Sequence, residues 1–167
     1  MKDISHNISF AHRLYNTFGQ TLREDNNLKS LLYQLDTKIE NTQKEAIGVG
    51  RECADCAVSG EGTCCGKRTG YKCDSILLLI NLLLGKSLPT QALDPHLCYF
   101  LTKQGCILRA RHVICVNFLC NRLRKNIPHE KLVRLQEITG KELNTLFILE
   151  EYIKKKIALD VPYPKRV

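Results

Sequence analysis

The chain has 167 residues, of which 44% are hydrophobic and 25% are charged. This balance is typical of a folded globular protein, and the length suits one domain with a sizeable core. It excludes the class of very small proteins whose core is too small to be stable without disulfides. The formal net charge is +8, but two [4Fe-4S]2+ clusters with cysteine ligands would each add about −2 and leave a smaller basic excess.

No segment of the sequence is long and apolar enough to cross a membrane. The longest apolar run is Ile76 to Ile80, continued after Asn81 by Leu82 to Leu84, which is about half of the roughly 20 residues that a span needs. The first six residues lack the apolar stretch of a signal peptide. We therefore expect a cytoplasmic protein without membrane association, in a compartment where thiols are mostly reduced.

Two amphipathic helices are predicted in the N-terminal part. Apolar residues recur three or four positions apart over residues 6–25, as they do on one helical face. Asp25-Asn26-Asn27 then interrupts the pattern with residues that favour a helix N-cap. The pattern resumes over residues 28–46 and ends at Gly48-Val49-Gly50. Both apolar faces indicate core packing, so residues 1–50 are predicted to form a helical hairpin.

The middle of the chain contains every cysteine of the sequence. An odd number of thiols cannot all pair as disulfides, whereas convergent thiolates are what a soft metal or an iron–sulfur cluster requires. Residues 51–73 are rich in cysteine and glycine and have no apolar periodicity, so a bound metal is expected to impose their shape. The nine candidate metal ligands are Cys53, Cys56, Cys64, Cys65, Cys73, Cys98, Cys106, Cys115 and Cys120.

Short elements are predicted between the cysteines. Asp74 or Ser75 should cap an apolar helix from Ile76 to Leu84, which Gly85 would stop. After an irregular stretch, residues 98–101 and 106–108 are predicted to pair as a minimal hairpin, with residues 102–105 as its turn.

The C-terminal part is predicted to be helical. Its expected helices are residues 112–125, with Cys115 in the first turn, residues 128–138 after Pro128, and residues 143–157, with a break and a capping box at Thr139 to Glu142. The predicted fold class is therefore mainly α. A helical bundle in a single domain, residues 1–167, would carry an irregular cysteine-rich metal-binding insert and at most a minimal β-hairpin. Its parts would be residues 1–50, 51–120 and 121–167.

The spacing of the thiols ranks them as ligands. Adjacent side chains usually point apart, so Cys64 and Cys65 are not expected to bind one mononuclear ion together. On a continuous helix Cys120 would lie about 140° around from Cys115. These arguments make Cys120, followed by Cys73, the weakest ligand candidates, since an isolated cysteine is more often a core residue.

Basic residues surround the second half of the cysteine segment. We predict that Arg109 and Arg111 help to bind the cofactor by balancing the negative charge of a thiolate centre. RNA or an acidic partner is the alternative use of this charge. The basic residues are not interleaved with aromatic side chains, which disfavours a nucleic-acid partner.

The order of the cysteines resembles that of a family of zinc- or iron-chelating proteins named for its CxxCxxCC motif. This family includes the YkgJ-like proteins and the cysteine-rich part of bacterial flagellin N-methylase. The resemblance covers about residues 51–120 and implies metal or iron–sulfur binding, with no established reaction. Its matching positions are Cys53, Cys56, Cys64, Cys65, Cys98, Cys106 and Cys115, with Arg111 before the last cysteine and Phe118 after it.

Three functions are consistent with these patterns. Thiols without a regular CxxC…CxxC ribbon favour an iron–sulfur cluster of the [4Fe-4S] type, in an electron-transfer or accessory module with a protein or redox partner. The alternative is a zinc-stabilised interaction protein, with a dinuclear bridged zinc site as its best form. A third is an enzyme whose cluster or metal keeps one open coordination position.

Overall fold

The computed structural model describes residues 4–46, 49, 52, 55–56, 64–102 and 104–160. This part of the chain is mainly α-helical, as predicted, and its β-structure is one two-stranded antiparallel sheet with an isolated bridge. None of its helices is both long and apolar enough to span a membrane. The elements are α1 (Ile4–Glu24), α2 (Asn26–Glu45), α4 (Lys67–Gly70), α5 (Ser75–Leu83), β1 (Leu101–Thr102), β2 (Gly105–Cys106), α6 (Val113–Asn117), α7 (Asn121–Asn126) and α8 (His129–Asp160).

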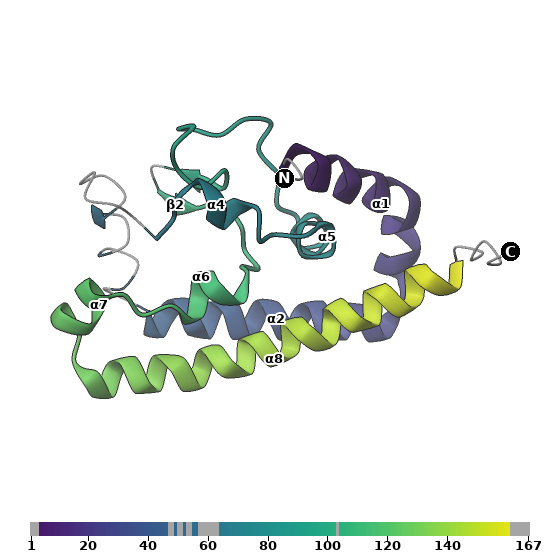
Figure 1. Cartoon of the computed structure of the whole chain (residues 1–167). Helices are drawn as coiled ribbons and strands as arrows, with labels where there is room; N and C mark the ends of the chain where they lie inside the picture. Colours follow the sequence, from purple (N-terminus) through teal and green to yellow (C-terminus); the bar gives the residue numbers. More distant parts are fainter. Residues whose placement is uncertain are drawn as a thin grey trace, which may run out of the picture.

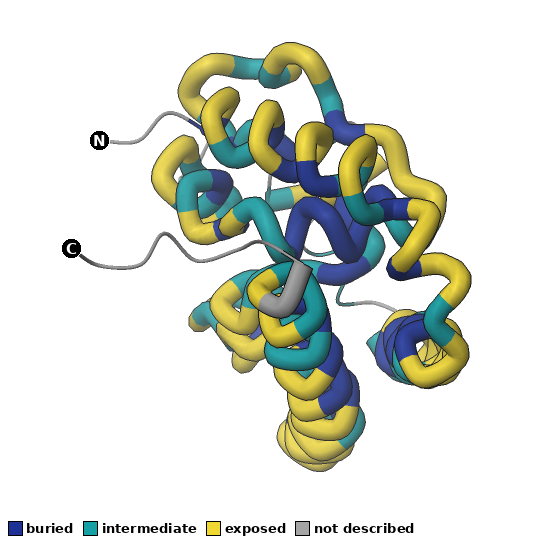
Figure 2. Tube along the Cα trace, turned by 90° about the vertical axis from the view of Figure 1, so that its right-hand side faces the viewer, coloured by how far each residue is buried: buried dark blue, intermediate teal, exposed yellow. Residues whose placement is uncertain are grey.

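The long helices form a frame around the short α5. Figure 1 shows α2 and α8 side by side at the bottom of the molecule and α1 turning back above the start of α2. In Figure 2 the coil of α5 is buried at the centre of the packed helices. Leu78, Leu79 and Ile80 have no exposed surface. The predicted apolar helix is therefore confirmed as the centre of the core, and Asp74 caps it by accepting a 2.9 Å hydrogen bond from the Leu77 amide.

The turn between α1 and α2 begins the second helix as predicted. The Asp25 carboxylate accepts hydrogen bonds from the amides of Asn27 and Leu28 at 2.9 and 3.0 Å, the arrangement of an N-cap. The same carboxylate pairs with Lys156 at 2.7 Å and accepts a hydrogen bond from the Tyr152 hydroxyl at 3.0 Å. One side chain therefore joins the α1–α2 turn to the end of α8.

A buried amide fixes the chain that leads into the last cysteines. Asn81 of α5 is fully buried, and its amide nitrogen donates hydrogen bonds of 2.9 Å to the carbonyls of Leu77 and Ala110. Its amide oxygen accepts hydrogen bonds from the backbone amides of Arg109 and Ala110 at 2.7 and 3.1 Å. Residues 109–110 are thereby attached to the core, and the cysteines on either side of them are held beside it.

The predicted helix over residues 112–125 is wrong. The structure has two short helices, α6 and α7, separated by residues 118–120. Cys120 occupies the N-cap position of α7, where its sulfur accepts a 3.5 Å hydrogen bond from the Leu123 amide. Cys115 and Cys120 therefore do not lie on one continuous helix. The angle of about 140° between them, which made Cys120 a weak ligand candidate, does not apply.

The predicted break at residues 139–142 is also wrong, because α8 runs without interruption from His129 to Asp160. Thr139 and Glu142 are each only 1% exposed, and Leu135, Leu146 and Leu149 beside them on α8 are buried as well. Burial of a continuous helical face along α2 outweighs a local capping signal, since most helical stability in proteins comes from tertiary packing. The 32-residue helix provides the support on which α6 also packs.

The predicted hairpin is confirmed in a shortened form. β1 and β2 pair antiparallel, with Leu101 opposite Cys106 and Thr102 opposite Gly105. Gly105 has a φ of 105°, a conformation that residues with a side chain rarely adopt. Of the irregular segment predicted over residues 51–73, Cys53 and most of residues 51–63 lie outside the described residues.

Candidate functional site

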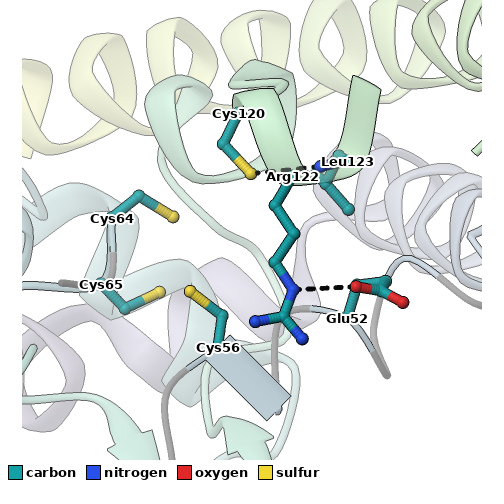
Figure 3. A pocket seen from close by; sticks show the side chains of 7 residues that line it. All are labelled: Glu52, Cys56, Cys64, Cys65, Cys120, Arg122 and Leu123. Carbon is teal, nitrogen blue, oxygen red and sulfur yellow. Dashed lines mark hydrogen bonds and ion pairs between the residues drawn. The ribbon is translucent and has the colours of Figure 1, made fainter. Parts of the chain in front are cut away.

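Four thiols line one small cavity at the cysteine-rich end of the molecule. We call Cys56, Cys64, Cys65 and Cys120 the cavity thiols. The cavity measures about 20 Å³, and Glu52, Arg122 and Leu123 complete its lining. Figure 3 shows the four sulfur atoms turned toward the same space, from three separate stretches of the chain. The fold therefore brings Cys120 to the first group of cysteines, from which 55 residues of sequence separate it.

Four further thiols lie close enough to change one another's pKa. We call Cys73, Cys98, Cys106 and Cys115 the hairpin thiols, after Cys106 of β2 and Cys98 just before β1. Burial first, and then the neighbouring thiols, raise the pKa of Cys73 and bring that of Cys115 to about 11. Burial also raises the pKa of Cys98 and of Cys106. These thiols are therefore protonated at neutral pH, and a metal that binds them must displace their protons.

The two groups of thiols are joined through the backbone of Cys65. Its carbonyl accepts a 2.7 Å hydrogen bond from the Cys98 amide. Gly66 and Leu97 form an isolated antiparallel bridge directly beside this bond. The Thr69 hydroxyl donates a 2.8 Å hydrogen bond to the carbonyl of Cys64 and holds the turn before α4. Backbone hydrogen bonds therefore hold the segment of Cys64 and Cys65 beside the segment of Cys98.

Close packing of α4 sets the distance between the two groups. A Cβ atom on Gly70 would lie 3.3 Å from the Tyr99 amide nitrogen and 3.6 Å from the Cys98 sulfur. The first distance is shorter than ordinary van der Waals contact. Glycine therefore lets the 64–73 segment approach the Cys98 backbone, and the sequence showed no signal for this contact other than the glycine itself.

The adjacent thiols Cys64 and Cys65 do not point apart as predicted. Both face the cavity (Figure 3). The hydrogen bond between their side chains raises the pKa of Cys64 and lowers that of Cys65. The lowered pKa makes Cys65 the more readily ionised thiol of the pair. The prediction that the two cannot serve one ion therefore loses its geometric basis.

The arginines predicted to balance a thiolate centre separate into two environments. The positive charge of Arg111 lowers the pKa of Cys106 and of Cys115, against the larger effect of burial. Arg109 instead contacts α2, where its guanidinium pairs with Asp36 at 2.7 Å and donates a 2.6 Å hydrogen bond to Gln43. Arg111 is therefore placed to balance charge, whereas Arg109 attaches the chain to a long helix.

Sequence reasoning missed an ion pair at the edge of the cavity. Arg122 pairs with Glu52 at 2.9 Å, and Asn126 donates a 3.0 Å hydrogen bond to the same carboxylate. The negative charges of Cys56 and Asp55 also raise the pKa of Arg122, after the larger effect of Glu52. Glu52 directly precedes Cys53 in the sequence, and that adjacency was the available signal.

The cysteine side chains gather in one region, but they are not arranged as a set of metal ligands in the described structure. Among the described residues, no group of three or more histidine, cysteine, aspartate or glutamate side chains is arranged to hold a metal ion. His112, which lies near the cysteines in sequence, accepts a 3.2 Å hydrogen bond from the Ile114 amide and caps α6. The cavity nevertheless offers four sulfur donors beside one carboxylate, Glu52, which is paired with Arg122, and sulfur donors are the chemistry that zinc and iron–sulfur centres select.

Comparison of the chain with protein-family models, with curated proteins and with solved structures gave no match.

Proposed function

We propose that this protein binds metal through its clustered thiols and serves as an electron-transfer or accessory module built on an iron–sulfur centre. The observation that carries the proposal is the gathering of eight cysteines into two adjacent groups, from segments far apart in the sequence. Chance burial of apolar cysteines would not turn four sulfur atoms to one cavity. The resemblance to the CxxCxxCC family supports the same conclusion from the order of the cysteines.

The hairpin thiols are our candidate ligands for the iron–sulfur cluster. Cys73 and Cys98 are 2% and 8% exposed, whereas Cys115 is half-buried and Cys106 is exposed, so a centre bound there would be shielded from water on the side of the core. The irregular chain around them suits a cluster, whose irons are spread over several ångströms and accept uneven ligand spacing. Arg111 would offset part of the negative charge of such a centre.

Zinc is the second candidate, and the cavity favours it. A volume of about 20 Å³ is close to that of one enclosed water molecule, and a structural zinc ion takes four sulfur or nitrogen ligands. On this alternative the metal stabilises a surface for a protein partner and has no redox role.

The test is the metal content of protein purified without oxygen. Iron, zinc and acid-labile sulfide are counted per chain, and the visible spectrum is recorded. We expect iron and sulfide in similar amounts, with absorption that bleaches on reduction. Zinc without sulfide would support the second candidate and reject the first. Metal-free protein with an unchanged circular dichroism spectrum and the same thermal unfolding would reject both.

A further inference from the structure

We infer that the cysteines form two separate metal centres and that Cys120 completes the first of them. This centre is a mononuclear site for one soft divalent cation of the zinc type, bound by Cys56, Cys64, Cys65 and Cys120. The inference rests on the proposed function, since it divides the same thiols between two metals. It assigns a ligand role to a cysteine outside the order shared with the CxxCxxCC family.

The cavity suits a single ion. Its volume of about 20 Å³ accommodates one atom-sized guest. Four thiolates at about 2.3 Å from a single ion are the usual complement of a structural zinc site. The cavity thiols are four in number and their sulfurs face one space (Figure 3). They are not arranged to hold an ion as they stand, so metal binding must draw the sulfurs together.

The break between α6 and α7 orients the sulfur of Cys120. Because the chain leaves helical geometry at residues 118–120, the Cys120 side chain is free of the α6 face and turns into the cavity (Figure 3). The Leu123 amide donates its hydrogen bond to this sulfur at 3.5 Å. Hydrogen bonds of this kind orient metal-bound thiolates and tune them. Leu123, Ile127 and Leu132 form a small apolar cluster that supports α7 from behind.

The charge at the edge of the cavity fits a zinc thiolate site. Four thiolates around one divalent cation leave a net charge of about −2. The Arg122 guanidinium lines the cavity and is held by Glu52 at 2.9 Å. A fixed cation beside the sulfurs lowers the cost of collecting their negative charge, and the paired Glu52 carboxylate offsets part of this effect.

The hairpin thiols form the second centre because the fold anchors them elsewhere. Asn7 of α1 donates a 3.0 Å hydrogen bond to the carbonyl of Cys73. Cys73 and Cys98 belong to the main apolar core, against which Cys65 also packs, whereas Cys120 packs with the separate cluster around α7. The 2.7 Å hydrogen bond from the Cys98 amide to the Cys65 carbonyl places the two groups of thiols next to each other.

The first experiment uses the unaltered chain. Reduced, metal-free protein receives one equivalent of Zn2+ and is treated briefly with an alkylating reagent, and each cysteine's labelling is read by mass spectrometry. We expect Cys120 to be protected at least tenfold together with Cys56, Cys64 and Cys65. Equal labelling of Cys120 with and without zinc would overturn the inference. If no cysteine is protected and no metal binds, the proposed function fails as well.

The second experiment separates the centres by mutation. Co2+ is titrated under anaerobic conditions, and its thiolate charge-transfer absorption gives the number of sites. We expect two equivalents for the wild-type chain, and one in both Cys120→Ser and its matched control Cys106→Ser, with different spectra remaining. Cys120→His should regain the lost equivalent with a shifted spectrum, because imidazole also binds zinc-type ions. An unchanged titration of Cys120→Ser, or loss of all binding in both serine variants, would contradict two centres.

Discussion

The helical region, made of α1, α2, α5 and α8, and the thiol region, residues 64–74 and 96–126, are organised by different forces. The helical region has three helices of at least 20 residues around a short apolar one. In the thiol region the helices have four to six residues and the strands have two. Elements this short are not stable by themselves. The contrast shows that the thiol region depends on attachment to the core for its shape, and under the proposed function on bound metal as well.

The largest effect is expected from truncating the centre of the helical region. Leu78→Ala removes a fully buried side chain of α5 and should lower the free energy of unfolding by about 2–5 kcal/mol. Urea unfolding followed by circular dichroism measures the loss. The matched control is Leu93→Ala, since Leu93 is 61% exposed and should change stability little. Equal losses in the two variants would contradict a core centred on α5.

The next effect tests the attachment between the two regions. Asn81→Ala leaves the amides of Arg109 and Ala110 without their side-chain acceptor, which should cost about 1–3 kcal/mol. Amide hydrogen exchange should rise most at residues 106–115, because Asn81 holds this segment on α5. The control is Asn41→Ala on the exposed face of α2. Faster exchange spread evenly over α1 and α2 would argue against this specific attachment.

A smaller effect is expected inside the thiol region. Gly70→Ala forces a methyl group to 3.3 Å from the Tyr99 amide nitrogen and should cost about 1–2 kcal/mol through overpacking. It should also weaken metal binding, because it pushes the Cys64–Cys65 segment away from Cys98. Gly140→Ala on α8 meets no atom within 4 Å and should be neutral or stabilising in thermal melts. Indistinguishable metal affinities in the two variants would refute the role of this contact.

The smallest effect concerns the acid stability of the helical region. The hydrogen bond from Lys156, followed by that from the Leu28 amide, lowers the pKa of Asp25 from 3.8 to about 2. The ionised carboxylate therefore stabilises the fold above pH 3.8, and this contribution is lost as the pH falls through about 2. Asp25→Asn keeps an N-capping side chain but removes the charge.

The expected result is a small drop in Tm for Asp25→Asn that is constant above about pH 4 and disappears toward pH 2. Thermal melts at pH 2 to 6 measure it. Lys156→Met should give the same pH profile, since it removes the other partner of the ion pair. A difference in Tm that grows as the pH falls would show that another group causes it.

Much of the helical region could be predicted because its signals are local. Asp25 and Asp74 cap the helices that the apolar periodicity indicated, and each does so through atoms within three residues. The signal at Thr139 to Glu142 was equally local but misleading. There a capping box competes with the burial of a whole helical face, and the burial prevails.

The site was predictable in its chemistry and not in its geometry. The confinement of every cysteine to residues 53–120 indicated thiolate ligands, whereas the adjacency of Cys64 and Cys65 argued against one shared ion. The sequence did not show that Cys120 faces the same cavity as Cys56, because that arrangement depends on where one short helix ends and the next begins. Nor did it distinguish Arg111, whose charge acts on the thiols, from Arg109, which is paired with Asp36.

The sequence by itself determined the mainly α fold class, the starts of α2 and α5, and the central position of the thiols. These properties depend on helical periodicity, on side chains that cap nearby amides, and on residue type, all of which act over a few positions. Only the tertiary structure decided which thiols face one another. Sulfur atoms from residues 56, 64–65 and 120 line one cavity because the buried core and the packing of α7 bring three distant segments together.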